Sequence, residues 1–119
     1  MAPSRVEVNL PEPTPVIEAV NRFNFNLGYD PCSCISFYKF VSGVPQNEPL
    51  GNAWDIKPNS KEPKTGSMIL TWEGSGHGGR VINYTDKTVT FEESNFEKCK
   101  KTVRTFNRSD VRIRGYRIF

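Results

Sequence analysis

The chain has 119 residues, of which 36% are apolar, and a formal net charge of +3. This length permits one hydrophobic core and excludes a second domain of ordinary size. The 8 Phe, 4 Tyr and 2 Trp are enough to anchor a core, which argues against wholesale disorder. No run approaches the roughly 18 apolar residues of a membrane span, and no apolar segment follows Met1, so we expect neither a membrane span nor a secretory signal.

Cysteine usage and charge distribution narrow the choice further. The three cysteines leave at least one thiol unpaired, which argues against a disulfide framework and favours synthesis in the reducing cytoplasm. The segment from Lys98 to Phe119 contains eight Lys and Arg residues and a single acid, Asp110. This basic end has two interpretations, an attraction to polyanions or a solvated strand face.

The first 29 residues form an N-terminal arm in this interpretation, and residues 30–119 form the folded domain. Residues 1–15 hold four prolines among polar residues, a pattern typical of an extended arm. Apolar residues at helical spacing then predict a short helix over residues 16–23. Those residues are Val16, Ile17, Val20 and Phe23.

The segment from Asp30 to Phe40 carries a cysteine into a predicted helix. Pro31 breaks the chain before the helix, and Gly43 with Pro45 ends it near Ser42. A cysteine in the first turn, here Cys34, lies among unpaired backbone N–H groups, which favour the thiolate. Without a base within reach, the same cysteine is a small buried hydrophobe.

A long polar loop and a series of strands follow the helix. Residues 44–66 are rich in Pro, Asn, Lys and Gly, and Trp54 within them is either a lid over the core or a wall of a substrate groove. Beyond Gly66 the apolar period changes to two, and a short turn at residues 84–87 indicates an antiparallel meander. The sequence predicts an α+β fold, with N-terminal helices packed on a sheet of about five strands. The predicted strands span residues 67–72, 79–84, 87–93, 100–107 and 111–118.

The only histidine lies in a glycine-rich approach to a strand. Small neighbours leave the ring of His77 accessible, although a histidine beside glycines is also a common turn residue. Glu93 and Asn95 lie two residues apart on an extended segment, so both can face one partner. Either can accept a hydrogen bond from an imidazole and fix its tautomer. The alternative is an exposed strand-end charge followed by a turn residue.

The order of these features resembles the successive blocks of CHAP domains, which are cysteine, histidine-dependent amidohydrolases and peptidases of the papain-like superfamily. The resemblance runs from about Asp30 to the C-terminus. The blocks are residues 34–37 (CISF), 51–54 (GNAW), 63–69 (PKTGSMI), 76–77 (GH), 93–96 (ESNF) and 113–116 (IRGY).

The resemblance implies a papain-like α+β fold and a peptidoglycan hydrolase of the kind found in phage endolysins and virion-associated lysins. Such an enzyme cleaves an amide bond through an acyl-enzyme, as an endopeptidase or as an N-acetylmuramoyl-L-alanine amidase, without a cofactor. Cys34 would be the nucleophile and His77 the base. The remaining site residues implied are Glu93 and Asn95, which orient His77, and the substrate contacts Trp54, Trp72, Gly76 and Gly78.

The resemblance also implies partners and a place of action. The substrate would be bacterial peptidoglycan, reached after cytoplasmic synthesis, and the N-terminal arm would attach the domain to other virion or tail proteins. Two features depart from the family pattern. Arg80 stands where an apolar strand residue is usual, so it must point out of the sheet or line the groove. Cys32 is unexpected so near Cys34, and we interpret it as an incidental neighbour.

Three other functions compete with the hydrolase. Cys32, Cys34, Cys99 and His77 would make a Cys₃His zinc site, although their spacing lacks paired knuckles. A nucleic-acid-binding module would use the basic end with Phe106, Tyr116 and Phe119 as stacking platforms, and would leave the Cys, His and Glu blocks without a role. A virion structural protein would keep the fold and lack catalysis.

Overall fold

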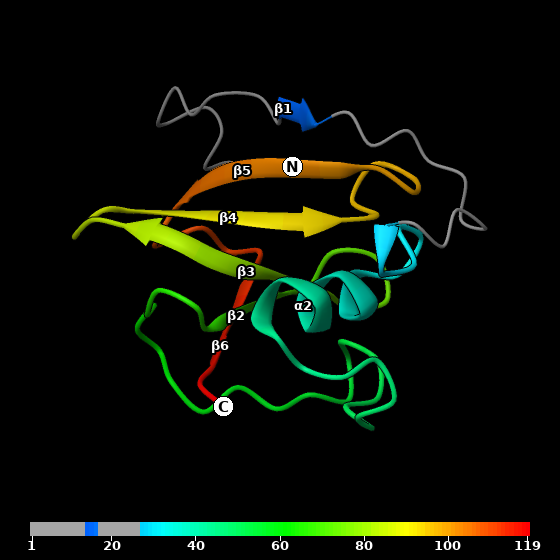
Figure 1. The fold of residues 1–119 in the computed structure, drawn as a ribbon. Helices are drawn as coiled ribbons and strands as arrows, with labels where there is room; N and C mark the ends of the chain where they lie inside the picture. The colour runs from blue at the N-terminus through cyan, green and yellow to red at the C-terminus, as the bar shows by residue number, and fades with distance from the viewer. Residues whose placement is uncertain (1–13, 17–26) are drawn as a thin grey trace.

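The structure is a computed structural model that describes residues 14–16 and 27–119. It contains a six-stranded antiparallel sheet in the order β1-β5-β4-β3-β2-β6, with the helix α2 against β3 and β4 (Figure 1). The elements are β1 (Thr14–Val16), α2 (Cys34–Ser42), β2 (Met68–Thr71), β3 (His77–Tyr84), β4 (Thr88–Ser94), β5 (Lys101–Asn107) and β6 (Ile113–Arg117).

The predicted combination of helix and antiparallel sheet is present, with strands dominating. All five predicted strands occur at the expected places, and β1 adds a sixth. Within the described residues α2 is the only α-helix. Of the helix predicted over residues 16–23, Val16 belongs to β1 and residues 17–23 lie outside the described part of the chain.

The meander prediction is wrong for the last strand. Strands β2 to β5 follow one another across the sheet, but β6 pairs with β2 and not with β5. The edge of β5 that β4 does not use pairs with β1 instead, with Thr14 opposite Val103. The edge of β2 accepts β6 instead, where Ile69 pairs with Tyr116. Apolar periodicity identifies a strand but not the strand that it pairs with. The sequence alone therefore did not reveal that β6 returns to pair with β2.

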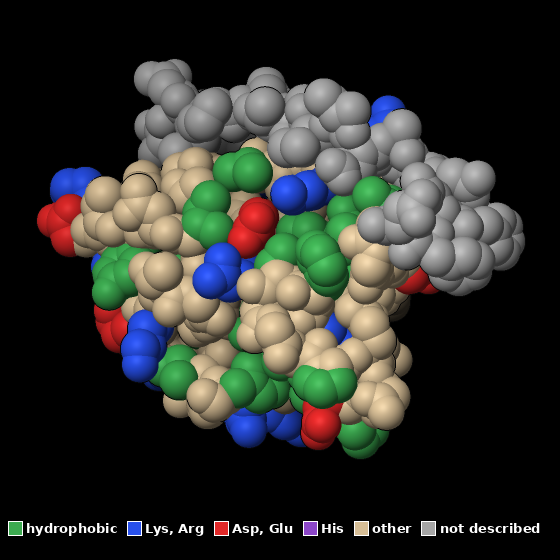
Figure 2. Space-filling model, viewed as in Figure 1, with side chains coloured by type: hydrophobic (Ala, Val, Ile, Leu, Met, Phe, Trp, Pro, Cys, Tyr) green, Lys and Arg blue, Asp and Glu red, His purple; other side chains and the backbone are tan. Residues whose placement is uncertain are grey.

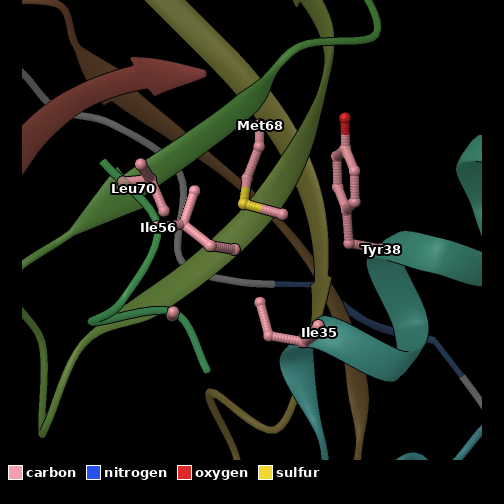
Figure 3. Close-up of a cluster of buried hydrophobic side chains, with 6 residues drawn as sticks. Ile35, Tyr38, Ile56, Met68 and Leu70 are labelled. Atoms are coloured by element: carbon pink, nitrogen blue, oxygen red, sulfur yellow. The ribbon is translucent and has the colours of Figure 1, made fainter. Parts of the chain in front are cut away.

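Strand β2 is buried on both faces and joins two hydrophobic clusters. Its successive side chains point to opposite faces, so Met68 and Leu70 enter one cluster and Ile69 the other. Figure 3 shows Ile35 and Tyr38 of α2 facing Met68 in the first cluster. Burying side chains of this size stabilises a fold by about 1.5–3 kcal/mol each. This packing fixes α2 on the sheet and thereby places the start of the helix.

Local hydrogen bonds define both ends of α2. The Oγ atom of Ser33, the N-cap residue, accepts from the backbone N–H of Ser36 at 3.1 Å. The backbone N–H of Asp30 donates to Oγ of Ser36 at 2.8 Å, which secures the preceding turn. Gly43 takes a left-handed φ of 73° at the C-cap. The predicted end of the helix at Ser42 and Gly43 is confirmed.

A disulfide bond joins Cys32 to Cys99 across 67 residues of sequence. Our expectation that Cys32 is an incidental neighbour is therefore wrong, while the expectation that at least one thiol stays unpaired is confirmed by Cys34, which is free. The pairing arises because the turn after β4 folds back over the front of α2, where Oγ of Ser94 donates to the carbonyl of Pro31 at 2.6 Å.

No helix in the described residues has the length and apolar character needed to cross a membrane.

Candidate active site

Cys34 is the first residue of α2 and lies next to the histidine on β3. Burial raises the pKa of the Cys34 thiol, but a hydrogen bond to His77 and the charge of His77 lower it. Backbone N–H groups of Gly78 and of Cys34 itself lower it further, and the result is below the ordinary value. The site therefore favours the thiolate, as expected for a cysteine at the start of a helix.

His77 is the first residue of β3, and its side chain is held between two groups. Its Nε2 atom lies 2.7 Å from Oε1 of Glu93, which leaves Nδ1 for the thiol of Cys34. Burial lowers the pKa of His77, whereas the hydrogen bonds and negative charges of Cys34 and Glu93 raise it to about 9. Between the lowered pKa of Cys34 and about pH 9, the pair is a thiolate and an imidazolium.

Gly76 allows the chain to approach the loop that carries Trp54. Its φ is 105°, and a Cβ atom there would lie 3.0 Å from the backbone nitrogen of Trp54. Any other residue at this position would be strained and crowded. The glycines beside His77 thus serve close packing of two loops, and the sequence interpretation of an accessible ring does not hold, because His77 is only 7% exposed.

Glu93 is the partner of His77, and its carboxylate is completely buried. Oε1 accepts from His77 and from Nη2 of Arg104 at 2.9 Å, and Oε2 accepts from Nε of Arg104 at 2.6 Å and from Oγ1 of Thr102 at 2.8 Å. Burial raises the pKa of Glu93, but His77 and Arg104 lower it below its ordinary range. The carboxylate stays ionised and fixes the proton of His77 on Nε2. The alternative of an exposed strand-end charge is excluded for Glu93.

Asn95 does not share this partner. Strand β4 ends at Ser94, and Asn95 turns away with a φ of 72°. Its Oδ1 atom accepts from the backbone N–H of Cys99 at 2.7 Å, so the amide supports the turn. The sequence argument that residues 93 and 95 face one side fails here, because it assumes that the extended segment continues.

Arg104 and Glu73 complete the site and were missed by the sequence analysis. The guanidinium of Arg104 also donates to both carboxylate oxygens of Glu73, at 2.7 and 2.8 Å. Arg104 belongs to the basic end of the chain, yet it is only 4% exposed. The alternation in β5 contained the signal, since Thr102, Arg104 and Phe106 share one face and Phe106 is a core residue.

An open cleft of about 540 Å³ lies in front of Cys34. Helix α2, the loop around Gly51 and the turns before β3 and after β4 form its walls. The residues that line it are Cys32, Ser33, Cys34, Ile35, Ser36, Lys39, Gln46, Gly51, Asn52, Ala53, Ser75, Gly76 and Asn95. Most of these side chains are small or polar, and the cleft can admit a polar chain.

The two tryptophans lie together beside this cleft. Trp54 and Trp72 are each 53% exposed, with ring centroids 5.5 Å apart. Arg114 lies 5.0 and 5.3 Å from the two centroids and donates to the carbonyls of Ala53 and Ile56. Ala53 and Ile56 cover the core instead of Trp54, so the lid interpretation of Trp54 is wrong. Gly78, the fourth predicted substrate contact, packs against Met68 and has its backbone N–H at Cys34.

The geometry argues against two of the competing functions. The disulfide removes Cys32 and Cys99 from the proposed zinc ligands. Phe106 and Tyr116 are buried, so neither can stack on a base. Arginines of the basic end are engaged with protein groups, as with Arg108 and Glu62, and Figure 2 shows Lys and Arg scattered over one face of the molecule. Arg80 pairs with Glu92 at 3.0 Å and does not line the cleft.

Comparison with known proteins adds no relative. No family model, no curated protein and no solved structure matches the chain. The function is therefore inferred from the residues of the site.

Proposed function

We propose that the protein is a cysteine peptidase or amidase with a papain-like CHAP fold, and that its substrate is an amide bond of bacterial peptidoglycan. One observation carries the proposal. Cys34 at the start of α2 is hydrogen-bonded to His77, and His77 is hydrogen-bonded to the buried carboxylate of Glu93. A nucleophile, a base and a group that orients the base are the three parts that thiol catalysis needs.

The chemistry follows from the charge states of this pair. The Cys34 thiolate attacks the carbonyl carbon of the amide, and the C–S bond forms as the carbonyl electrons move to oxygen. The imidazolium of His77 gives its proton to the leaving amine as the C–N bond breaks, which leaves an acyl-enzyme. Neutral His77 then takes a proton from water, the hydroxide displaces the thiolate, and the acid product leaves.

The start of α2 also offers stabilisation of the oxyanion. The backbone N–H of Cys34 is at the first helical position, where a helix makes no internal hydrogen bond with that group. The positive end of the helix dipole adds to its effect. Loss of one such donor costs a hydrolase about 100- to 1,000-fold in rate. The N-cap of Ser33 and the disulfide of Cys32 hold this helix start in place.

The choice of peptidoglycan rests on the CHAP-like block order and on the form of the cleft. The cleft is open and polar and suits an extended peptide stem, while Trp54 and Trp72 lie at its side. Indole rings stack well on the apolar faces of sugars. We propose that the peptide enters the cleft and that the adjoining sugar contacts the tryptophans. Virion or tail proteins remain the proposed partners of the N-terminal arm.

The test is hydrolysis of purified Gram-positive cell walls. Cys34→Ala and His77→Ala should each lose at least about 1,000-fold in rate, because each removes a reacting group. Arg80→Gln is the matched control, since Arg80 lies on the strand of His77 and pairs outside the site. Mass spectrometry of the products separates the two activities, because an endopeptidase exposes new amino termini and an amidase frees lactyl groups. Retained lysis by Cys34→Ala would exclude the proposed nucleophile.

A further inference from the structure

A second carboxylate, Glu73, lies behind the Glu93 that orients His77, and Arg104 bridges the two. Arg104 makes four hydrogen bonds to these carboxylates, at 2.6 to 2.9 Å. It is 4% exposed, and its guanidinium lies 3.5 Å from the ring centroid of Phe96. A buried arginine of this kind is fixed in position because every route of movement breaks a charged hydrogen bond.

The bridge controls which oxygen faces His77. Oε2 of Glu93 is saturated by Arg104 and Thr102, so Oε1 alone is left for Nε2 of His77. Arg104 shares Oε1 with His77 through Nη2 at 2.9 Å. Two cations therefore meet on one carboxylate oxygen, and Glu73 supplies the negative charge that balances the second cation.

We propose that Arg104, held by Glu73, is a positioning residue that orients the Glu93 carboxylate toward His77 and sets the basicity of His77. The proposal deepens the function above and rests on it. Arg104 does not line the cleft, and it acts through Glu93.

Charged groups from several elements surround His77, and the sign of the effect of each on the pKa of His77 can be assigned. Cys34 of α2 and Glu93 of β4 raise the pKa of His77. Glu73, in the turn before β3, also attracts the imidazolium, since His77 in turn lowers the pKa of Glu73. Arg104 of β5 repels it, and Arg112 lies farther out, 3.9 Å from Glu73 and paired with Asp110.

Two substitutions should consequently shift His77 in opposite directions. Arg104→Gln keeps an amide N–H donor for Glu93 but removes the neighbouring positive charge, so the pKa of His77 should rise by about one unit. Glu73→Gln removes a negative charge and leaves Arg104 to Glu93 alone, so the pKa should fall by a similar amount. A purely structural ion pair would lower stability and leave both values unchanged.

The measurement is the pH titration of the imidazole by NMR in protein without a histidine tag. The imidazole signal is unambiguous because the chain has one histidine. Arg80→Gln, the matched control, should match the parent value. Opposite shifts in the two variants support the proposal, and parent values in both overturn it. If Arg104→Gln does not fold, Glu73→Gln decides alone, a fall supporting the proposal and no change overturning it.

Activity supplies the second readout and keeps the two proposals separate. In wall hydrolysis the alkaline limb of kcat/KM should move with the imidazole pKa of each variant. A parent protein that hydrolyses no wall material would reject the substrate proposed above, while the NMR shifts would still be measurable. An active parent with unshifted variants would reject the role of Arg104 only.

Discussion

At the scale of the residue, one carboxylate determines how the site behaves. Glu93 is buried in the sheet with all of its acceptor positions used, and it remains ionised because cations surround it. A buried charge without such partners would cost several kcal/mol. The histidine that it holds can therefore serve as a proton donor at neutral pH.

A second prediction about a single residue concerns Trp54, whose proposed role is to bind the substrate. In the Cys34→Ala background, Trp54→Ala should weaken the affinity for soluble peptidoglycan fragments about 10-fold. The reason is that a stacked aromatic side chain typically contributes roughly 1 kcal/mol or more to binding. Trp54 and Trp72 are the only tryptophans of the chain, so quenching of intrinsic fluorescence in the Cys34→Ala protein reports the contact directly.

The control for this variant is Phe119→Ala. Phe119 is 60% exposed and contacts Tyr38, away from the lining of the cleft. Its loss should leave the affinity unchanged. Equal affinities of the parent and the Trp54→Ala protein would remove Trp54 from the substrate site.

Single residues also show what a sequence can predict. Cys34, His77 and Glu93 could be selected because a thiol at a helix start, a lone imidazole and a carboxylate near a strand end each suggest chemistry locally. Arg104 could not, since its role depends on Glu73 thirty-one positions away. Asn95 was assigned the wrong partner because one left-handed residue ends the alternation of β4.

At the scale of the element, the front of α2 is fixed to the turn after β4 by the disulfide. Cys32→Ser should lower the free energy of unfolding by about 2–5 kcal/mol, because the bond closes a long loop in the unfolded chain. Chemical denaturation of the folded variant measures this loss. A change below about 0.5 kcal/mol would contradict a structural role of the bond.

The same variant separates stability from chemistry. The Ser33 cap and the packing of Ile35 and Tyr38 still hold α2 on the sheet when Cys32 is replaced, so hydrolysis below the unfolding transition should continue. Complete loss of activity in a folded Cys32→Ser protein would mean that the disulfide also shapes the cleft, which Cys32 lines.

The helix and the strands were predictable because each is set by local rules. Pro31, Ser33 and Gly43 define the ends of α2, and alternation defines the strands. The disulfide partner and the pairing of β6 with β2 were not predictable, since both join segments distant in sequence. Counting cysteines cannot identify which of them meet.

At the scale of the whole molecule, several arginines of the basic end are paired with groups of the protein itself. Arg104, Arg112 and Arg114 are bound to carboxylates or carbonyls of the protein. These carboxylate partners offset part of the positive charge that the sequence places at this end. The exposed cations that remain in it are fewer, among them Lys98 and Lys100.

The pH dependence of hydrolysis is a property of the coupled pair. On the acid side kcat/KM should rise as Cys34 loses its proton, at a pH below the ordinary thiol range, because its pKa is lowered. On the alkaline side it should fall near pH 9, as the imidazolium of His77 loses the proton needed by the leaving amine. A value of kcat/KM that keeps increasing up to about pH 10 would contradict this assignment.

The most direct test of the site is the rate at which Cys34 is alkylated by iodoacetamide as a function of pH. Cys34 is the only free thiol, since Cys32 and Cys99 are paired, so glutathione and the His77→Ala protein serve as references. We predict that the parent is alkylated rapidly at a pH where an ordinary thiol is still protonated, because the pKa of Cys34 is lowered, and that His77→Ala returns it to ordinary thiol behaviour. A parent that follows glutathione and does not respond to His77→Ala would contradict the thiolate–imidazolium pair.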